Sequence, residues 1–202
     1  MTTRTLELSG PAGLLEAELT MPDDDPTGIA VLAHPHPLYG GSMRDAVLDA
    51  AAGVLRAQGN ACLRFNFRGV GRSAGHHDHG EGETEDLLAA MQAARLVAPG
   101  APLLIGGYSF GAFVAWRASH VQTPARILLI APPVAAMTFS GDLPAGAVLD
   151  VVFGNRDDFA PEDNIRLWAG SLHGSVRLHR VADADHFFSD RLDRLADAVR
   201  AD

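Results

Sequence analysis

The sequence predicts an α/β fold, in which helices cover both faces of a mostly parallel, doubly wound sheet. Apolar runs without polar alternation indicate strands that are buried on both sides, as in a parallel sheet. Segments with helical period and composition separate these runs, so the predicted order is strand, helix, strand, repeated. With 202 residues, 47% of them hydrophobic, the chain has the size of one globular domain, and we expect a single domain over residues 1–202.

The N-terminal segment is predicted to form an antiparallel hairpin. Residues 5–8 and 14–20 are short runs, and the second alternates apolar with acidic side chains. Turn-forming residues at positions 9–13 lie between them, which is typical of two strands joined by a turn.

The remaining elements follow in order. Predicted strands cover residues 29–33, 61–67, 103–105, 127–131, 148–153 and 176–181. Predicted helices cover residues 45–57, 84–96, 112–120, 161–172 and 191–201. The longest predicted loop, residues 69–83, carries three histidines, and long loops in small domains often have a function. Only residues 132–147 separate two of the strands where a helical lid could be inserted, so we expect no lid domain and an open site.

The composition excludes several classes of partner. The net charge of -9 comes from 25 acidic residues against 16 arginines that are scattered along the chain, so we expect no nucleic-acid partner. No apolar run approaches the roughly 20 residues that span a bilayer, so we expect no membrane segment. Cys62 is the only cysteine and the N-terminus lacks a signal-peptide pattern, which favours a cytoplasmic location.

The pentapeptide Gly107-Tyr108-Ser109-Phe110-Gly111 has the spacing and context of a nucleophile elbow. It follows a predicted strand and opens a predicted helix. The turn must be tight, so the positions two before and two after the serine must be small, and both are glycine. At a helix N-terminus, the free N–H of Phe110 would favour a developing oxyanion. Ser109 is therefore the candidate nucleophile, and an ordinary flexible turn is the alternative.

A serine hydroxyl needs a neighbouring base, and an acid and a histidine follow Ser109 at two later strand ends. Asp157 comes directly after the strand at 148–153, and His186 follows the strand at 176–181. Three strand ends would bring these groups to one edge of the sheet. Asp158 is the alternative acid, but the Gly-x-x-Asp spacing favours Asp157.

The segment His34-Pro35-His36-Pro37 follows the strand at 29–33 and is expected to supply the second donor of an oxyanion hole. Proline has no N–H, so we select the amide of His36 over those of Leu38 and Tyr39.

Two groups of histidines could bind a metal, but neither has a third ligand at a convincing spacing. We interpret the first pair, His34 and His36, as part of the oxyanion loop. Residues 76–79 are expected to form a solvated loop, Cys62 an inert core thiol, and His173 and His179 surface or packing residues. We therefore expect no metal and no cofactor.

Aromatic and other apolar side chains near these loops are expected to line a substrate pocket: Tyr39, Tyr108, Met137, Phe159 and Phe187, with Phe139 close by. Arg68 and Arg72 lie near the same rim. They would either attract a carboxylate or form surface salt bridges.

Two longer motifs carry a resemblance to a known family. They are the His-Pro-His-Pro…Gly-Gly loop at residues 34–41 and the Arg-Phe-Asn-Phe-Arg-Gly-Val-Gly-x-Ser segment at residues 64–73, followed by a Gly-rich motif ending at Glu83. The chain resembles the α/β-hydrolase superfamily over its whole length, and is similar to small, lidless bacterial serine hydrolases. The resemblance implies an α/β-hydrolase fold, a catalytic triad at Ser109, Asp157 and His186, and a carboxylesterase-like activity. The acid loop at residues 157–161 departs from the family by lacking its usual valines.

The predicted function is hydrolysis of a carboxylic ester or thioester through an acyl-enzyme on Ser109. The substrate would be a small molecule, or an acyl group bound to a carrier. An acyltransferase with the same triad and a catalytically silent binding protein of the same fold are the alternatives. The helix at 191–201 could pair across a two-fold axis in a homodimer, although its pattern does not require this.

Overall fold

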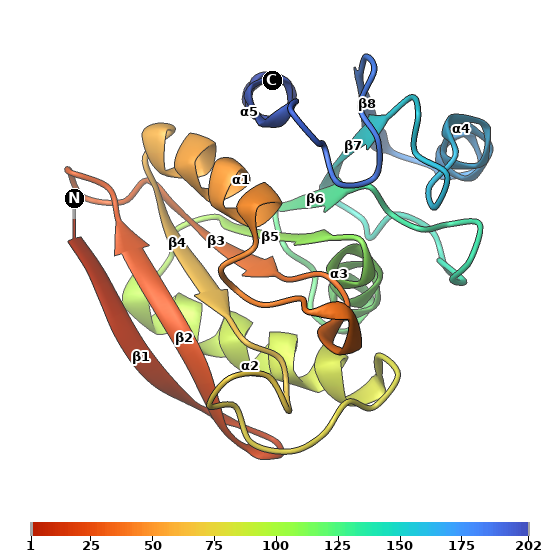
Figure 1. Ribbon diagram of the computed structural model, residues 1–202. Coiled ribbons are helices and arrows are strands. Elements are labelled where there is room, and N and C mark those ends of the chain that lie inside the picture. Colours follow the sequence, from red (N-terminus) through yellow and green to blue (C-terminus); the bar gives the residue numbers. More distant parts are fainter. Residues whose placement is uncertain (1, 202) are drawn as a thin grey trace.

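In the computed structural model, which describes residues 2–201, one eight-stranded sheet is covered by helices on both faces (Figure 1). The strands are β1 (Thr2–Gly10), β2 (Gly13–Met21), β3 (Gly28–Ala33), β4 (Asn60–Phe65), β5 (Leu103–Tyr108), β6 (Arg126–Ile130), β7 (Val148–Gly154) and β8 (Ser175–Val181). The helices are α1 (Ala46–Ala57), α2 (Glu81–Val97), α3 (Phe110–Val121), α4 (Glu162–Gly170) and α5 (Leu192–Arg200), with a short 3₁₀ helix, η1, at Pro37–Tyr39.

The strand order is β1-β2-β4-β3-β5-β6-β7-β8, and only the N-terminal hairpin departs from parallel pairing. Strand β2 is antiparallel to both β1 and β4, whereas all pairs from β4 to β8 are parallel. Every residue of the central strands β3 and β5 is buried, which explains why neither strand alternates apolar with polar side chains. The predicted fold class, including the hairpin, is confirmed.

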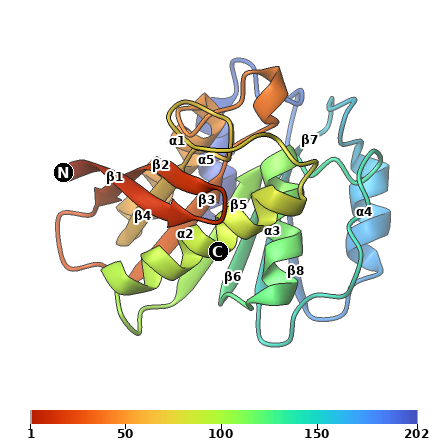
Figure 2. The same cartoon turned by 90° about the horizontal axis from the view of Figure 1, so that it is seen from below.

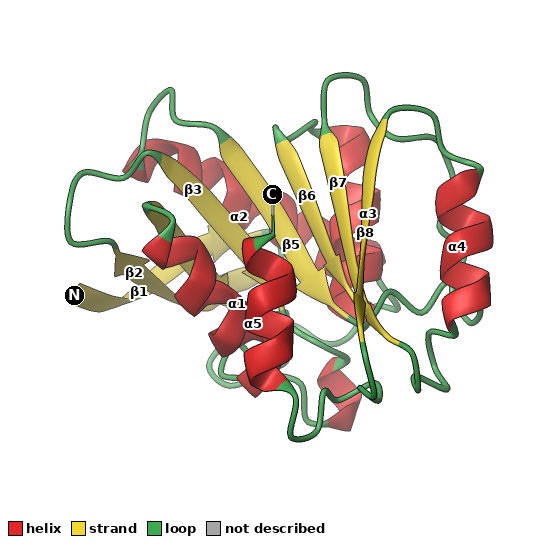
Figure 3. Cartoon of the chain, turned by 90° about the horizontal axis from the view of Figure 1, so that it is seen from above, coloured by secondary structure: helices red, strands yellow, loops and turns green. Residues whose placement is uncertain are grey.

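The helices divide between the two faces of the sheet. Helices α2 and α3 lie in front of the sheet when it is seen from below (Figure 2), and α1 and α5 lie in front of it when it is seen from above (Figure 3). Helix α4 lies to the side of the sheet, beyond β7 and β8, in both views. Between β6 and β7, residues 131–147 form a loop without a helix, so no lid covers the chain there. No helix among residues 2–201 is long and apolar enough to cross a membrane.

Two helix starts differ from the prediction because of side-chain caps. Asp45 lies before α1 rather than inside it, and its carboxylate accepts hydrogen bonds from the amides of Val47 and Leu48. Helix α2 begins at Glu81, three residues earlier than expected, because the Glu83 carboxylate reaches back to the amides before the first turn.

Strand β5 is three residues longer than predicted. Gly106 and Gly107, which interrupt the apolar run, still pair in parallel with β3 and β6. Strand β4 ends two residues early, at Phe65, because the chain then turns and the amide of Phe67 donates to His34. The β5 extension carries the chain directly to Ser109 at the end of the strand.

A buried carboxylate organises the far edge of the sheet. Asp150 on β7 contacts Arg126 on β6 at 2.6 Å, and Arg177 and His179 on β8 at 2.7 and 2.9 Å. Burial by itself would raise the pKa of Asp150. The hydrogen bonds and positive charges of its partners outweigh burial, so the pKa of Asp150 is lowered. The prediction that His179 is a surface or packing residue was therefore incomplete, since it pairs with a buried charge.

Candidate active site

Ser109 occupies a strained turn between β5 and α3. Its backbone has φ 55° and ψ −117°, a region that non-glycine residues rarely adopt. A Cβ atom at Gly107 would collide with the backbone of Gly111, and one at Gly111 would collide with the carbonyl groups of Ala33 and His34. The two glycines therefore let the turn close as tightly as the spacing predicted.

The loops after β7 and β8 bring an acid and a histidine to Ser109. The Nε2 atom of His186 lies 2.9 Å from the Oγ of Ser109, and its Nδ1 lies 2.8 Å from Oδ2 of Asp157. The side chains of His186 and Asp157 are buried, which excludes most water from the contact between them. With the proton on Nδ1, the imidazole donates to Asp157 and can accept the proton of the serine hydroxyl.

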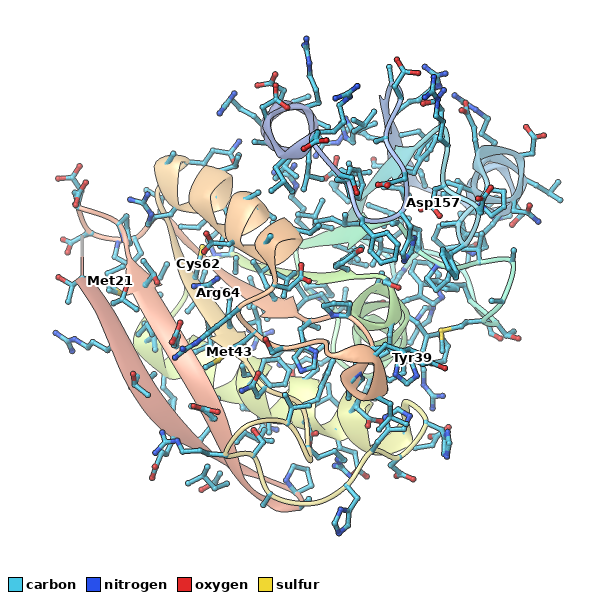
Figure 4. The ribbon with its side chains drawn as sticks, viewed as in Figure 1. Met21, Tyr39, Met43, Cys62, Arg64 and Asp157 are labelled. Carbon is cyan, nitrogen blue, oxygen red and sulfur yellow. The ribbon has the colours of Figure 1, made fainter. Side chains whose placement is uncertain are left out.

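The carboxylate of Asp157 is itself held in place. Its Oδ1 accepts hydrogen bonds from the amides of Phe159 and Ala160, each at 2.8 Å. Asp158 next to it is exposed. Figure 4 shows Asp157 among the loops beyond β7, and Cys62 far from it on β4.

Burial raises the pKa of the Cys62 thiol to about 12, so this thiol stays protonated at neutral pH.

In the loop after β3, the amides of His36, Leu38 and Tyr39 are the candidate oxyanion donors, and only that of His36 is free of a hydrogen bond to the described residues. The amide of Leu38 donates to Nδ1 of His36 at 3.2 Å, and that of Tyr39 donates to the His36 carbonyl at 3.1 Å. Within residues 2–201, neither the amide of His36 nor that of Phe110 donates a hydrogen bond. Two free N–H groups near a serine can stabilise negative charge on a substrate oxygen.

His34 holds this loop through a neutral imidazole. Its Nδ1 donates to the carbonyl of Pro35 at 2.6 Å, and its Nε2 accepts from the amide of Phe67 at 3.0 Å. Burial lowers the pKa of His34 to about 4, because a protonated ring would lose its hydration. Gly41 has no room for a Cβ atom, since it would collide with the carbonyl of Pro35. The His-Pro-His-Pro…Gly-Gly motif is thus one folded unit.

Aromatic side chains surround the site on two sides. The rings of Phe159 and Phe187 lie with centroids 5.0 and 5.5 Å from that of His186, and are 59% and 62% exposed. Tyr39, at the end of η1, is 86% exposed (Figure 4). Its ring packs at an angle of 48° against that of His36, with the centroids 4.7 Å apart. The structure brings these three predicted pocket residues to an open rim.

The other predicted pocket residues lie elsewhere. Tyr108 is only 3% exposed and lies beneath His186, because alternate side chains of a strand point to opposite faces. Met137 is half-buried against the core, and Phe139 is buried between Trp116 and Trp168. The prediction that Tyr108 lines the pocket was wrong.

Arg68 and Arg72 near the rim both form ion pairs with acidic side chains. Arg68 forms a bidentate, buried ion pair with Asp86, at 3.0 and 2.9 Å, so it is committed to the fold. Arg72 pairs with Glu16 and Glu7. The salt-bridge interpretation of both arginines is therefore the one that the structure favours. Among the described residues, no cluster of three or more histidine, cysteine or acidic side chains could hold a metal ion.

The histidine loop is only partly solvated. His76 and His79 are exposed, but the side chain of His77 is 8% exposed and packs against the rings of His36 and Phe110. The expectation of a solvated loop was wrong for His77, because the loop folds back over the start of α3. No sequence signal predicts this contact, although Gly80 and Glu83 have the spacing of a helix cap.

The model of the serine aminopeptidase S33 family matches residues 38–167, which include Ser109 and Asp157. The chain belongs to this family of α/β serine hydrolases. An uncharacterised protein of Rickettsia prowazekii is 33% identical over 95% of this chain and 84% of its own length.

Two solved structures are similar over nearly the whole chain. One is an α/β serine hydrolase without a lid from Xanthomonas campestris, 35% identical, covering 99% of this chain and 93% of that one, with a TM-score of 0.93. The other is an α/β serine hydrolase homologue from Coxiella burnetii, 31% identical, covering 99% and 97% of the two chains, also with a TM-score of 0.93. This S33 family member thus has the fold of a lidless α/β serine hydrolase.

Proposed function

We propose that the protein cleaves a carboxylic ester or thioester through an acyl-enzyme on Ser109. The observation that carries this proposal is the continuous chain of contacts from Ser109 through His186 to Asp157, at 2.9 and 2.8 Å. A serine hydroxyl becomes a useful nucleophile only when a positioned base can take its proton.

In the first half of the reaction, the Oγ of Ser109 attacks the carbonyl carbon while His186 accepts the hydroxyl proton. Asp157 holds the imidazole in the required tautomer and stabilises the imidazolium. The amides of Phe110 and His36 bind the oxyanion, and one such donor is worth about 10²–10³ in kcat. The bond to the alcohol or thiol then breaks, and His186 gives its proton to the leaving group.

In the second half, water attacks the acyl-enzyme. His186 takes a proton from the water, the second tetrahedral intermediate collapses, and the carboxylic acid leaves as the Ser109 hydroxyl is restored. Side chains and main-chain amides of this chain suffice for every step.

The open aromatic rim indicates the class of substrate. Phe159 and Phe187 present apolar surface beside His186. The absence of a lid helix between β6 and β7 leaves a long acyl chain uncovered. We therefore favour neutral esters or thioesters with short or medium chains, or the exposed end of a carrier-bound acyl group.

The test is a panel of p-nitrophenyl esters and matched acyl thioesters of increasing chain length, with an aminoacyl p-nitroanilide as the amide comparison. We expect turnover of short and medium esters or thioesters that falls to background in Ser109→Ala. Added methanol separates hydrolysis from acyl transfer, because a transferase would form mainly the methyl ester. Equal turnover by Ser109→Ala, or none by folded wild-type protein across the panel, would contradict the proposal.

A further inference from the structure

Behind the two free amides, three aromatic side chains from separate segments contact one another. His36 comes from the loop after β3, Phe110 from the start of α3, and His77 from the loop between β4 and α2. The ring centroids are 4.8 Å apart for His36 and Phe110, 4.9 Å for His36 and His77, and 5.5 Å for His77 and Phe110. His77 therefore contacts both residues whose amides we assign to the oxyanion.

Glu83 holds the loop that carries His77 at the start of α2. Its fully buried carboxylate accepts hydrogen bonds from the amides of Asp78 and Gly80 at 2.9 and 2.8 Å. Its Oε1 also lies 2.8 Å from Nδ1 of His77, a close contact that does not have hydrogen-bond geometry. Burial by itself would raise the pKa of Glu83. The backbone hydrogen bonds outweigh burial, so the pKa of Glu83 is lowered. The loop that carries His77 is thus fixed by a buried anion rather than by solvent-exposed contacts.

His77 also forms the wall of a hollow outside the ring cluster. A cavity of about 380 Å³ lies between η1 and residues 68–79, and His77 lines it together with Leu38 and Val70. Leu38 and Tyr39 on η1 are largely exposed, so η1 itself has little other support on this side. Without the His77 ring, the hollow would extend to His36 and Phe110.

We propose that His77 is a positioning residue that sets the distance between the two oxyanion donors. The inference rests on the proposed function, because it gives His77 a role only in binding the transition state. Oxyanion donors act at 2.7–3.1 Å, and a misplacement of about 1 Å can cost about 100-fold in rate. The His77 ring, on a loop that Glu83 fixes through the amides of Asp78 and Gly80, packs against His36 and Phe110 and holds the His36 loop against α3 at the required separation.

The first test compares His77→Ala and His77→Phe with His76→Ala, a matched change of the exposed neighbouring histidine. We expect His77→Ala to lower kcat about 10- to 100-fold with KM within about threefold, since the loss falls on the transition state. Affinity for a boronic acid, which forms a tetrahedral adduct with the serine, should fall in parallel. His77→Phe, which keeps a ring, should restore most of kcat, and His76→Ala should match the wild type.

The second test needs no activity and separates this inference from the proposed function. Amide hydrogen exchange of residues 34–41 should accelerate in His77→Ala, while exchange around His186 should not change. Wild-type kcat in His77→Ala, equal loss of kcat in His77→Phe, or unchanged exchange at residues 34–41 would each overturn the packing role. A wild-type protein without hydrolase activity would instead overturn the proposed function, and the exchange experiment would still decide whether His77 holds the loop.

Discussion

The hydroxyl of Tyr108 donates a hydrogen bond to the main-chain carbonyl of His186, 3.0 Å away. Tyr108 is the last residue of β5 and directly precedes Ser109, so this bond joins the turn that carries the serine to the loop that carries the histidine. Burial raises the pKa of the Tyr108 hydroxyl, so the group remains a donor at neutral and moderately alkaline pH.

Tyr108→Phe should remove this link while keeping the ring. We expect the free energy of unfolding to fall by about 1 kcal/mol, the usual net value of one hydrogen bond. We also expect kcat to fall about tenfold, which corresponds to a similar loss in the transition state. Urea unfolding and steady-state ester hydrolysis measure the two effects. Tyr39→Phe is the stability control, because the exposed Tyr39 should leave the free energy of unfolding unchanged; an unchanged Tyr108→Phe would show that the bond is unimportant.

The neighbouring acids Asp157 and Asp158 provide a matched pair. Asp157→Asn should lower kcat by about 10⁴, because the amide would favour the wrong tautomer of His186. Asp158→Asn should stay within about threefold of wild type, since Asp158 is exposed. Steady-state kinetics of both variants decide the assignment, and a larger loss in Asp158→Asn would mean that the acid was chosen wrongly.

Two glycines should respond in opposite ways to alanine. Gly111→Ala would drive a Cβ atom into the carbonyl groups of Ala33 and His34, and we expect it to destabilise the protein by about 3 kcal/mol or more. Gly53 lies inside α1 with open space around it, so Gly53→Ala should stabilise by about 1 kcal/mol through helix propensity. Chemical unfolding tests both, and a stable, active Gly111→Ala protein would contradict the described geometry of the turn.

His34 should make stability depend on pH. Its folded pKa of about 4 lies below its ordinary value of 6.5, so between these values the unfolded chain binds a proton that the folded protein does not. The free energy of unfolding should therefore fall as the pH is lowered from about 6.5 to about 4, by about 3 kcal/mol in total, and should be insensitive to His34 above pH 7. Urea unfolding at pH 4 to 8 should show a flatter profile for His34→Gln, and parallel profiles would refute this origin.

The central strands and the serine turn could be predicted because their signals are local. The apolar runs that became β3 and β5 are buried on both faces, and the glycines around Ser109 are required by the tightness of one turn. The orientation of Tyr108 could not be predicted in the same way. In a strand that is apolar throughout, nothing marks which side chains point toward the site and which point beneath it.

Contacts between loops that are distant in the sequence could not be predicted from local patterns either. The spacing after Gly154 favoured Asp157 over Asp158, and the structure places Asp157 against His186. The packing of His77 on His36 joins residues 41 positions apart, and it depends on how residues 69–80 return to α2. The start of α2 was missed because Glu83 caps the helix with its side chain.

The central claim, that Ser109 is activated by His186, is tested most directly by labelling with a fluorophosphonate probe, followed by peptide mass spectrometry. Wild type, Ser109→Ala, His186→Ala and the control Asp158→Asn are compared, each with its folding verified by its unfolding midpoint. We predict modification at Ser109 in the wild type and the control, none in Ser109→Ala, and strongly slowed labelling in His186→Ala. Absence of label on folded wild-type protein, or label on a different serine, would contradict the account.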